Sequence, residues 1–242
     1  MSSTNYLRSY ESRKSKQNSF FKKIKLKFFG VPDLPQYFFQ WIQTKYFAHN
    51  KNIKYICDLG CGRCTFFPHD YKNYQDWVFH GLDIGNNLEE QLAQRDIKLF
   101  LGDLNKEIPL NKNKYDVIIC SNLIEHLNQP ENLIRNIYEI LSPGGIALVL
   151  TPDIKTWGYR FYNDYTHVRP YTLKSLSTIF NVFGFEVLYA ESNNIYQSIV
   201  KKYHETKKSF LSFLMFSFFF LIKKIINRNT DIEILVKKPY QN

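Results

Sequence analysis

Short apolar runs alternate with longer mixed segments along most of this chain. The runs have the length and the Val, Ile, Leu and Phe content of strands. Run 115–123 is almost continuously apolar, which is typical of a strand covered on both faces. The expected strands are 54–60, 77–84, 97–103, 115–123, 146–152, 185–192 and 231–238.

Helices are predicted between these strands. Pro130 suits the first turn of one helix, Thr172 suits the N-cap of another, and Gly184 is suited to end that second helix. The SPGG sequence at 142–145 predicts a turn. Alternating strands and helices predict an α/β fold with a mostly parallel, doubly wound sheet. The expected helices are 32–47, 87–95, 130–141 and 172–183.

Composition permits a buried core, because 44% of the residues are apolar, but the charge is unevenly distributed. The net charge is +10; residues 1–30 hold eight Lys or Arg against one Glu, and residues 201–228 hold seven against one Glu. The rest of the chain is therefore slightly acidic. Nucleic-acid enzymes carry positive charge around the active face, whereas basic residues flanking apolar ones favour an anionic membrane surface. We expect such a membrane surface as a partner, and no nucleic acid.

Lysine pairs flank the most apolar stretch, residues 209–222. This stretch is shorter than the roughly 20 residues that a spanning helix needs. It also lies between two strands predicted for one sheet, so the chain must leave and return on the same side. The pattern predicts an interfacial helix, with a buried or oligomer-forming helix as the alternative. With no signal peptide recognised, we expect a cytoplasmic protein, peripheral on the inner face of the membrane.

These patterns divide the chain into four segments. They are a basic, partly disordered segment at 1–30, a core at 31–200, a basic and apolar insertion at 201–228, and a last core strand at 229–242. The patterns do not predict an oligomeric state.

A glycine-rich turn follows the first expected strand. Asp58, Gly60 and Gly62 form the pattern D-x-G-x-G, in which glycines let the backbone turn tightly and approach a ligand. Thr65 stands where a dinucleotide fingerprint has glycine, which disfavours NAD.

Acidic residues end the next two expected strands. Asp83 stands at about the separation from the glycine turn at which a carboxylate binds a ribose diol, and Asp103 can accept from an adenine amino group. Both positions favour an adenosine-containing ligand.

The four cysteines indicate a reducing cytosol. Cys57, Cys61 and Cys64 also have the spacing of the iron–sulfur triad of radical-SAM enzymes. Cys57, however, lies inside an expected strand, where a small buried side chain is expected. The sheet pattern is also short of the repeats of a barrel. We therefore expect no metal centre.

Five motifs follow in order along the chain: DLGCG, GLDI, LGDL, YDVIICSNLIEHL and LSPGGIALVLTPD. Over residues 53–192 and the last strand, their order and spacing resemble class I S-adenosylmethionine (SAM)-dependent methyltransferases. The resemblance implies a Rossmann-like, seven-stranded sheet with an antiparallel last strand and helices on both faces, and SAM at the carboxyl ends of the strands. The family often has a third glycine where Cys64 stands.

The resemblance also implies which residues hold SAM. The turn after the first strand would hold the methionine part, the next two strand ends would hold ribose and adenine, and the fourth strand end would line the methyl-donor side. The implied residues are Asp58, Gly60, Gly62, Asp83, Ile84, Asp103, Leu104, Ser121 and Asn122.

His126, after the fourth strand, is a first candidate for acceptor chemistry, because methyl transfer to a hydroxyl benefits from a general base. An equal alternative is that Glu125 and His126 line the pocket or cap the next helix.

The loop after the fifth strand, residues 161–172, is a second candidate. Asp164 and His167 can deprotonate or orient a hydroxyl, Arg169 can bind an anionic group, and Tyr165 can contact the acceptor. Alternatively, the loop is structural, with Arg169 paired to Asp164.

The THVRPYT segment resembles methyltransferases that accompany glycan and polysaccharide assembly. We therefore predict a SAM-dependent O-methyltransferase acting on a sugar hydroxyl of a glycan or lipid-linked saccharide. An isoprenoid quinone or lipid phenol is the alternative acceptor. An RNA methyltransferase and an inactive SAM-binding scaffold are the alternatives from other classes.

Overall fold

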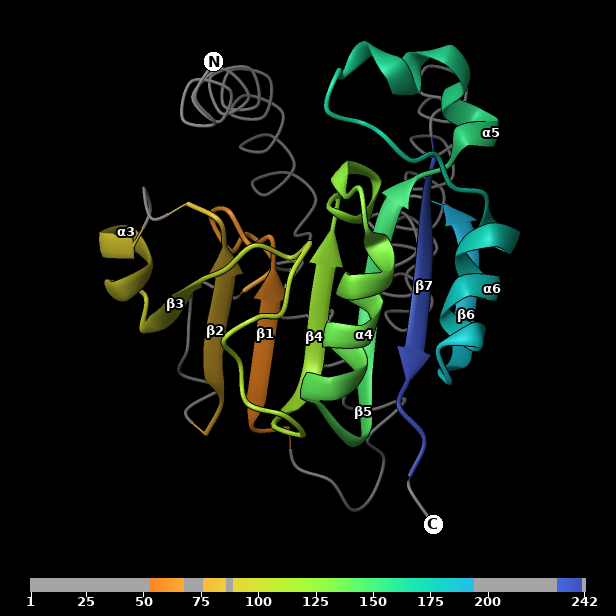
Figure 1. Cartoon of the computed structure of the whole chain (residues 1–242). Helices are drawn as coiled ribbons and strands as arrows, with labels where there is room; N and C mark the ends of the chain where they lie inside the picture. Colours follow the sequence, from red (N-terminus) through yellow and green to blue (C-terminus); the bar gives the residue numbers. More distant parts are fainter. Residues whose placement is uncertain (1–52, 68–75, 86–88, 194–229, 241–242) are drawn as a thin grey trace, which may run out of the picture.

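The computed structural model describes residues 53–67, 76–85, 89–193 and 230–240. Within these residues a seven-stranded sheet has the order β3-β2-β1-β4-β5-β7-β6 (Figure 1). Neighbours from β3 to β5 are parallel, whereas β7 runs antiparallel to both β5 and β6. The strands are β1 Tyr55–Leu59, β2 Val78–Asp83, β3 Ile97–Leu101, β4 Tyr115–Ser121, β5 Leu141–Pro152, β6 Glu186–Asn193 and β7 Asp231–Lys237.

The predicted sheet, with its antiparallel last strand, is confirmed. The expected helix at 32–47 and the segments at 1–30 and 201–228 lie outside the described residues. The helices are α3 Glu89–Ala93, α4 Pro130–Ile140, α5 Ile154–Trp157 and α6 Leu173–Val182, with 3₁₀ turns η1 Ile124–His126 and η2 Gly158–Asn163.

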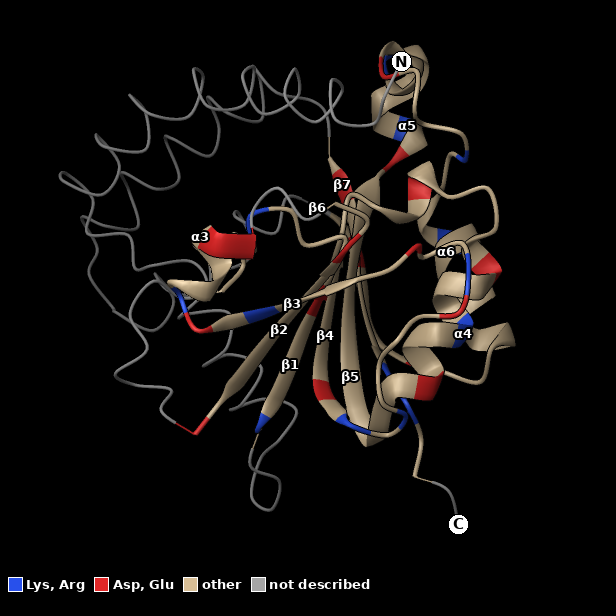
Figure 2. Ribbon diagram, turned by 60° about the vertical axis from the view of Figure 1, so that its left-hand side comes forward, with Lys and Arg blue, Asp and Glu red and all other residues tan. Residues whose placement is uncertain are grey.

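Two apolar clusters cover the two faces of the sheet. Successive β4 residues alternate between them, because side chains on a strand point to opposite faces in turn. Ile118 packs with residues of α4 and α6, while Val117 and Ile119 pack in the other cluster, which includes Leu92 of α3. Figure 2 shows α4 and α6 together on one side of the sheet. The continuous apolar run of β4 thus reflects burial on both faces.

Local signals place α6 as predicted. The Thr172 hydroxyl accepts a hydrogen bond from the Ser175 backbone N–H, and the Ser175 hydroxyl accepts one from the Thr172 N–H. This reciprocal capping box satisfies two N–H groups at the helix start. Gly184 follows the helix with φ 85°, a conformation that favours glycine.

The predicted turn at 142–145 is instead built into β5, which begins at Leu141. Leu141 pairs with Tyr115, but Ile146 already pairs with Val117, so the intervening residues form a bulge. Gly144 has φ 74°, and a Cβ there would lie 2.4 Å from the Tyr240 ring. The glycine signal was therefore correct, but strand pairing continues across the bend.

β1 and β4 are neighbours, although the chain runs outward from β1 to β2 and β3 and from β4 to β5 in the opposite direction. In open α/β sheets, ligands bind at the carboxyl ends of the strands beside such a switch point. α5 and η2 lie beyond the same end of the sheet (Figure 1). Among the described residues, no helix is long and apolar enough to cross a membrane.

Candidate active site

The turn after β1 lies at the switch point. Gly60 and Cys61 donate backbone hydrogen bonds to the Leu82 carbonyl, at 2.8 and 3.1 Å. Gly60 has φ 67°, and a Cβ there would lie 2.9 Å from Leu123 at the end of β4. Gly62 has φ 46°, with nothing within 4 Å of where a Cβ would stand. The turn is therefore packed against β4 at Gly60 and open at Gly62.

Two carboxylates flank this turn. Asp83 accepts a hydrogen bond from the Gly62 backbone N–H at 2.9 Å, which ties the end of β2 to the turn. Asp58 is buried at the end of β1, and burial, followed by the nearby Asp83 charge, raises its pKa. Two nearby carboxylates, one buried, favour a positively charged group beside them.

The residues predicted near ribose and adenine lie at or just after the ends of β2 and β3. Asp103 accepts hydrogen bonds from the backbone and side chain of Asn105, and the Asn105 backbone bond is the main cause of its lowered pKa. Leu104 is buried in the core, so its side chain is not available to a ligand. Ile84, in contrast, is 67% exposed beside Asp83 and leaves an apolar side chain available for stacking.

The end of β4 completes the predicted SAM region. Ser121 is half-buried and Asn122 is exposed, and the Asn122 amide donates to the Ser121 hydroxyl at 3.3 Å. Asn122 has φ 50°, a left-handed conformation that asparagine tolerates better than most residues. Its backbone N–H donates to the Leu150 carbonyl at 2.9 Å, which orients this strand end beside β5.

The cysteines pack as small apolar residues, as predicted. Cys57 belongs to the cluster with α4 and α6, whereas Cys61 and Cys64 belong to the cluster on the opposite face. A Cβ on Gly81 would lie 2.7 Å from the Cys61 sulfur and 3.0 Å from the Cys64 sulfur. Cys64 has φ 48°, which explains why glycine is common at this position in the family.

Arg95 was not identified from the sequence, yet it supports the turn. Its guanidinium donates to the carbonyls of Arg63, Cys64 and Phe67, at 3.0, 3.4 and 3.2 Å. These contacts join residues about 30 positions apart in the sequence, so no local sequence pattern predicts them. Arg95 therefore positions the turn from outside it.

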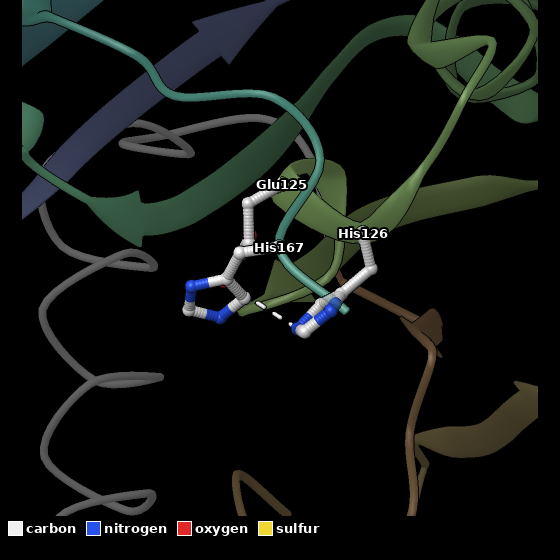
Figure 3. Close-up of side chains that lie close together, drawn as sticks. All are labelled: Glu125, His126 and His167. Carbon is white, nitrogen blue, oxygen red and sulfur yellow. Dashed lines mark ion pairs between the residues drawn. The ribbon is translucent and has the colours of Figure 1, made fainter. Parts of the chain in front are cut away.

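The structure brings the two acceptor candidates together. The rings of His126 in η1 and His167 in the loop after β5 lie 4.7 Å apart (Figure 3). The backbone N–H groups of Val168 and Arg169 both donate to the Glu125 carbonyl, at 2.9 and 3.1 Å. These bonds hold the loop against the end of β4, which the separation along the chain did not reveal.

Hydrogen bonds define which nitrogen of each ring carries the proton. His126 Nδ1 lies 3.2 Å from the Thr166 carbonyl, and His167 Nδ1 lies 2.8 Å from the Phe161 carbonyl. A carbonyl oxygen only accepts, so each Nδ1 must donate. The Thr166 hydroxyl, which donates to Asp164 at 2.6 Å, also accepts from His126 Nδ1 at 2.8 Å. Each neutral ring therefore keeps its lone pair on Nε2.

The Glu125 side chain lies close to both histidines. Its side chain is buried; Oε2 accepts from the Thr151 hydroxyl at 2.9 Å, while Oε1 has no hydrogen-bond partner and lies 3.9 Å from His126 Nε2. Burial raises the pKa of Glu125 to about 7, and burial, with His167 next in effect, lowers that of His126. The next helix, α4, has Gln129 at its N-cap and no side-chain cap hydrogen bond, so Glu125 and His126 do not cap it.

Two further candidate residues of the loop, Asp164 and Arg169, are half-buried. Arg169 pairs with Glu131 of α4 at 3.3 Å, and Asp164 accepts from the Thr166 hydroxyl, so these partners differ from the Arg169–Asp164 pair of the structural alternative. Tyr165 is exposed, as are Tyr159 and Tyr162 on η2. The loop thus presents aromatic side chains to solvent near the histidine pair.

Comparisons with known proteins agree with this geometry. Residues 33–190 match a family model described as a methyltransferase domain. The uncharacterized protein MJ0638 of Methanocaldococcus jannaschii is 27% identical over 155 residues, covering 63% of this chain and 64% of that protein. A ubiquinone biosynthesis O-methyltransferase of Pseudomonas savastanoi pv. phaseolicola is 25% identical over 117 residues, covering 45% of this chain and 48% of that protein.

A solved structure shares the fold. Phosphoethanolamine N-methyltransferase 2 of Haemonchus contortus, in complex with SAM, superposes with a TM-score of 0.58 at 16% identity, covering 85% of this chain and 52% of that chain. The present chain thus spans between about half and two thirds of the length of these curated relatives.

The sheet order, the antiparallel β7 and the glycine turn at the switch point are those of the Rossmann-like class I methyltransferase fold. The family match extends over most of the chain, and the chain belongs to this methyltransferase-domain family. Its described residues share the fold of the Haemonchus methyltransferase solved with SAM.

Proposed function

We propose that this methyltransferase binds SAM along the carboxyl ends of β1 to β4 and methylates a hydroxyl group. The open space at Gly62 and the buried Asp58 carboxylate fit the donor, because one admits a close ligand and the other favours its ammonium group. Asp83 and the exposed Ile84 fit the ribose end. When bound, SAM supplies a methyl group activated by its sulfonium.

The observation that carries hydroxyl methylation is the cluster of Glu125, His126 and His167. A hydroxyl must lose its proton as its oxygen is methylated, and a group that assists this loss accelerates the transfer. The cluster offers two imidazole lone pairs and a carboxylate oxygen without a hydrogen-bond partner, next to the strand end predicted to line the methyl-donor side.

A phenolic hydroxyl, as in a quinone precursor, is the first acceptor candidate. The similarity to a ubiquinone biosynthesis O-methyltransferase, 25% identical over 117 residues, supports this class. A sugar hydroxyl of a glycan or lipid-linked saccharide is the second candidate. The exposed Tyr159, Tyr162 and Tyr165 support it, because aromatic rings offer an apolar face for packing with a polar tip.

The test is to incubate the purified protein with methyl-labelled SAM and cell extract, and then to separate lipid, glycan, protein and RNA. We expect label in the lipid or glycan fraction, together with S-adenosylhomocysteine. A dihydroxybenzene and a sugar glycoside, supplied separately, then distinguish the two acceptor classes. Label in RNA or protein, or SAM binding without S-adenosylhomocysteine formation, would overturn the proposal.

The variants Glu125→Gln and Glu139→Gln make a matched pair for this assay. Glu139, on α4, forms a surface ion pair with Lys112. Turnover should fall at least tenfold in Glu125→Gln with little change in SAM affinity, and Glu139→Gln should behave as wild type. Equal losses in both variants would contradict a role for the cluster.

A further inference from the structure

We propose that Glu125, His126 and His167 form a binding site for one divalent first-row transition metal ion, which receives the acceptor hydroxyl. One ligand atom from each residue lies within 4.8 Å of the other two (Figure 3). The inference deepens the proposed function and, in its catalytic part, rests on it. It also departs from the metal-free centre expected from the sequence.

The orientation of both histidines matches that of metal ligands. A ligating histidine usually donates its second N–H to a carbonyl, a carboxylate or a comparable acceptor, which fixes the ring and its tautomer. His126 Nδ1 donates to the Thr166 hydroxyl and carbonyl, and His167 Nδ1 donates to the Phe161 carbonyl. Both Nε2 atoms therefore keep their lone pairs available for a shared ion.

Glu125 supplies the independent observation. Its side chain is fully buried, the Thr151 hydroxyl occupies Oε2, and Oε1 has no hydrogen-bond partner. A buried polar atom without a partner is costly. An ion bridging Oε1 and His126 Nε2, which lie 3.9 Å apart, would remove this cost. The oxygen that lacks a hydrogen-bond partner thus lies 3.9 Å from the His126 nitrogen that keeps its lone pair.

The donor set selects the type of ion. Metal–ligand bonds of about 2.0–2.2 Å place neighbouring ligands roughly 3–3.5 Å apart, so the observed atoms need only side-chain adjustments to close around an ion. Two imidazoles and one carboxylate suit Zn²⁺, Co²⁺ or Fe²⁺, whereas Mg²⁺ and Ca²⁺ prefer oxygen ligands. Three protein ligands leave at least one position for the acceptor oxygen.

The ion would act on the hydroxyl directly. A bound divalent cation lowers the pKa of a coordinated hydroxyl, so its proton passes to solvent water. The resulting oxygen forms a bond to the methyl carbon while the carbon–sulfur bond breaks, and the electron pair leaves with the sulfur. S-adenosylhomocysteine and the methyl ether are the products.

Metal binding can be tested without any acceptor. The protein, without a histidine tag, is stripped with a chelator and titrated with Co²⁺, monitored by visible absorption and calorimetry. We expect one Co²⁺ per chain, displaced by Zn²⁺, and a loss of affinity of at least tenfold in His126→Ala, His167→Ala and Glu125→Gln. Glu139→Gln should bind as wild type, and circular dichroism and SAM affinity confirm folding.

Thr166 serves as a positioning residue in this scheme, because its hydroxyl links His126 to Asp164. Thr166→Val should weaken Co²⁺ binding by about 10-fold or more, and Thr166→Ser should restore it. A merely structural role would lower the unfolding temperature without this rescue of Co²⁺ affinity.

Cys61 and Cys64 provide the decisive control, because thiolates also bind these ions. Co²⁺ binding should persist in Cys61→Ala and Cys64→Ala. Binding that is lost in these variants, or absent from the wild type, would overturn the site.

The catalytic part has separate outcomes. If the stripped enzyme loses methyl transfer and regains it with Zn²⁺ or Co²⁺, the role of the ion is supported. If the stripped enzyme methylates a hydroxyl at an undiminished rate, the catalytic role of the ion fails while the proposed function stands. If Co²⁺ binds at this cluster but no hydroxyl acceptor is methylated, the proposed function fails while the metal site stands.

Discussion

Replacing Gly62 by alanine tests whether the donor approaches the turn after β1. Gly62 and Gly158 both have positive φ, 46° and 54°, and at both positions an added Cβ would meet no atom within 4 Å. Alanine at either position retains the backbone N–H, so the Gly62 bond to Asp83 can persist. Both variants add backbone strain, with the larger strain expected at Gly158, because its ψ of −135° lies in a region nearly confined to glycine; only Gly62 lies at the predicted SAM turn.

The left-handed conformation costs an alanine roughly 1–2 kcal/mol. Gly62→Ala should lose about that much unfolding free energy, and Gly158→Ala about 1–3 kcal/mol, both measured with urea. If SAM lies against Gly62, the new methyl group occupies part of its space, and we expect SAM affinity to fall at least tenfold, or about 1.4 kcal/mol.

Calorimetric titration with SAM decides the outcome, with Gly158→Ala as the control that should bind within twofold of wild type. Unchanged SAM affinity in Gly62→Ala would refute the assigned position of the donor. Equal losses in both variants would show that general strain causes the effect.

Three further predictions concern residues that support the site or the core. Arg95→Ala removes three hydrogen bonds from a charged donor to backbone carbonyls; urea unfolding should show a loss of about 1.5–3 kcal/mol, together with weaker SAM binding, and a variant as stable as wild type would contradict the supporting role. Lys238→Met removes the hydrogen bonds that the buried Nζ donates to the Asn113 side chain and to the carbonyls of Tyr138 and Leu141. The free energy of unfolding should therefore fall by about 3 kcal/mol. A gain in stability would show that the cost of burying the charge outweighs these hydrogen bonds. Burial raises the pKa of Glu233 from 4.5 to about 8, so the folded state retains a proton that the unfolded state loses, and stability should fall as pH rises between these values. Glu233→Gln should flatten that slope, and an unchanged slope would assign it to other groups.

The sheet was predictable because its signals are local. Burial on both faces gives β4 its continuous apolar run, and Thr172 and Gly184 mark the ends of α6 through hydrogen bonding and backbone conformation. Strand pairing is less local, so the bulge at Gly144 became part of β5 and was not a separate turn. The helix at 32–47 and the segment at 201–228 lie outside the described residues and stay predictions.

Sequence alone determined the fold class and the glycine turn, and it predicted the donor, because each depends on residues close together along the chain or at successive strand ends. Only the tertiary structure decided how the acceptor side is arranged. His126 and His167 meet because backbone bonds from the loop after β5 reach the Glu125 carbonyl, and the tautomers follow from carbonyl acceptors beside them. Oε1 of Glu125 lacks a hydrogen-bond partner because the side chain is buried. This burial cannot be predicted from the spacing of residues along the chain.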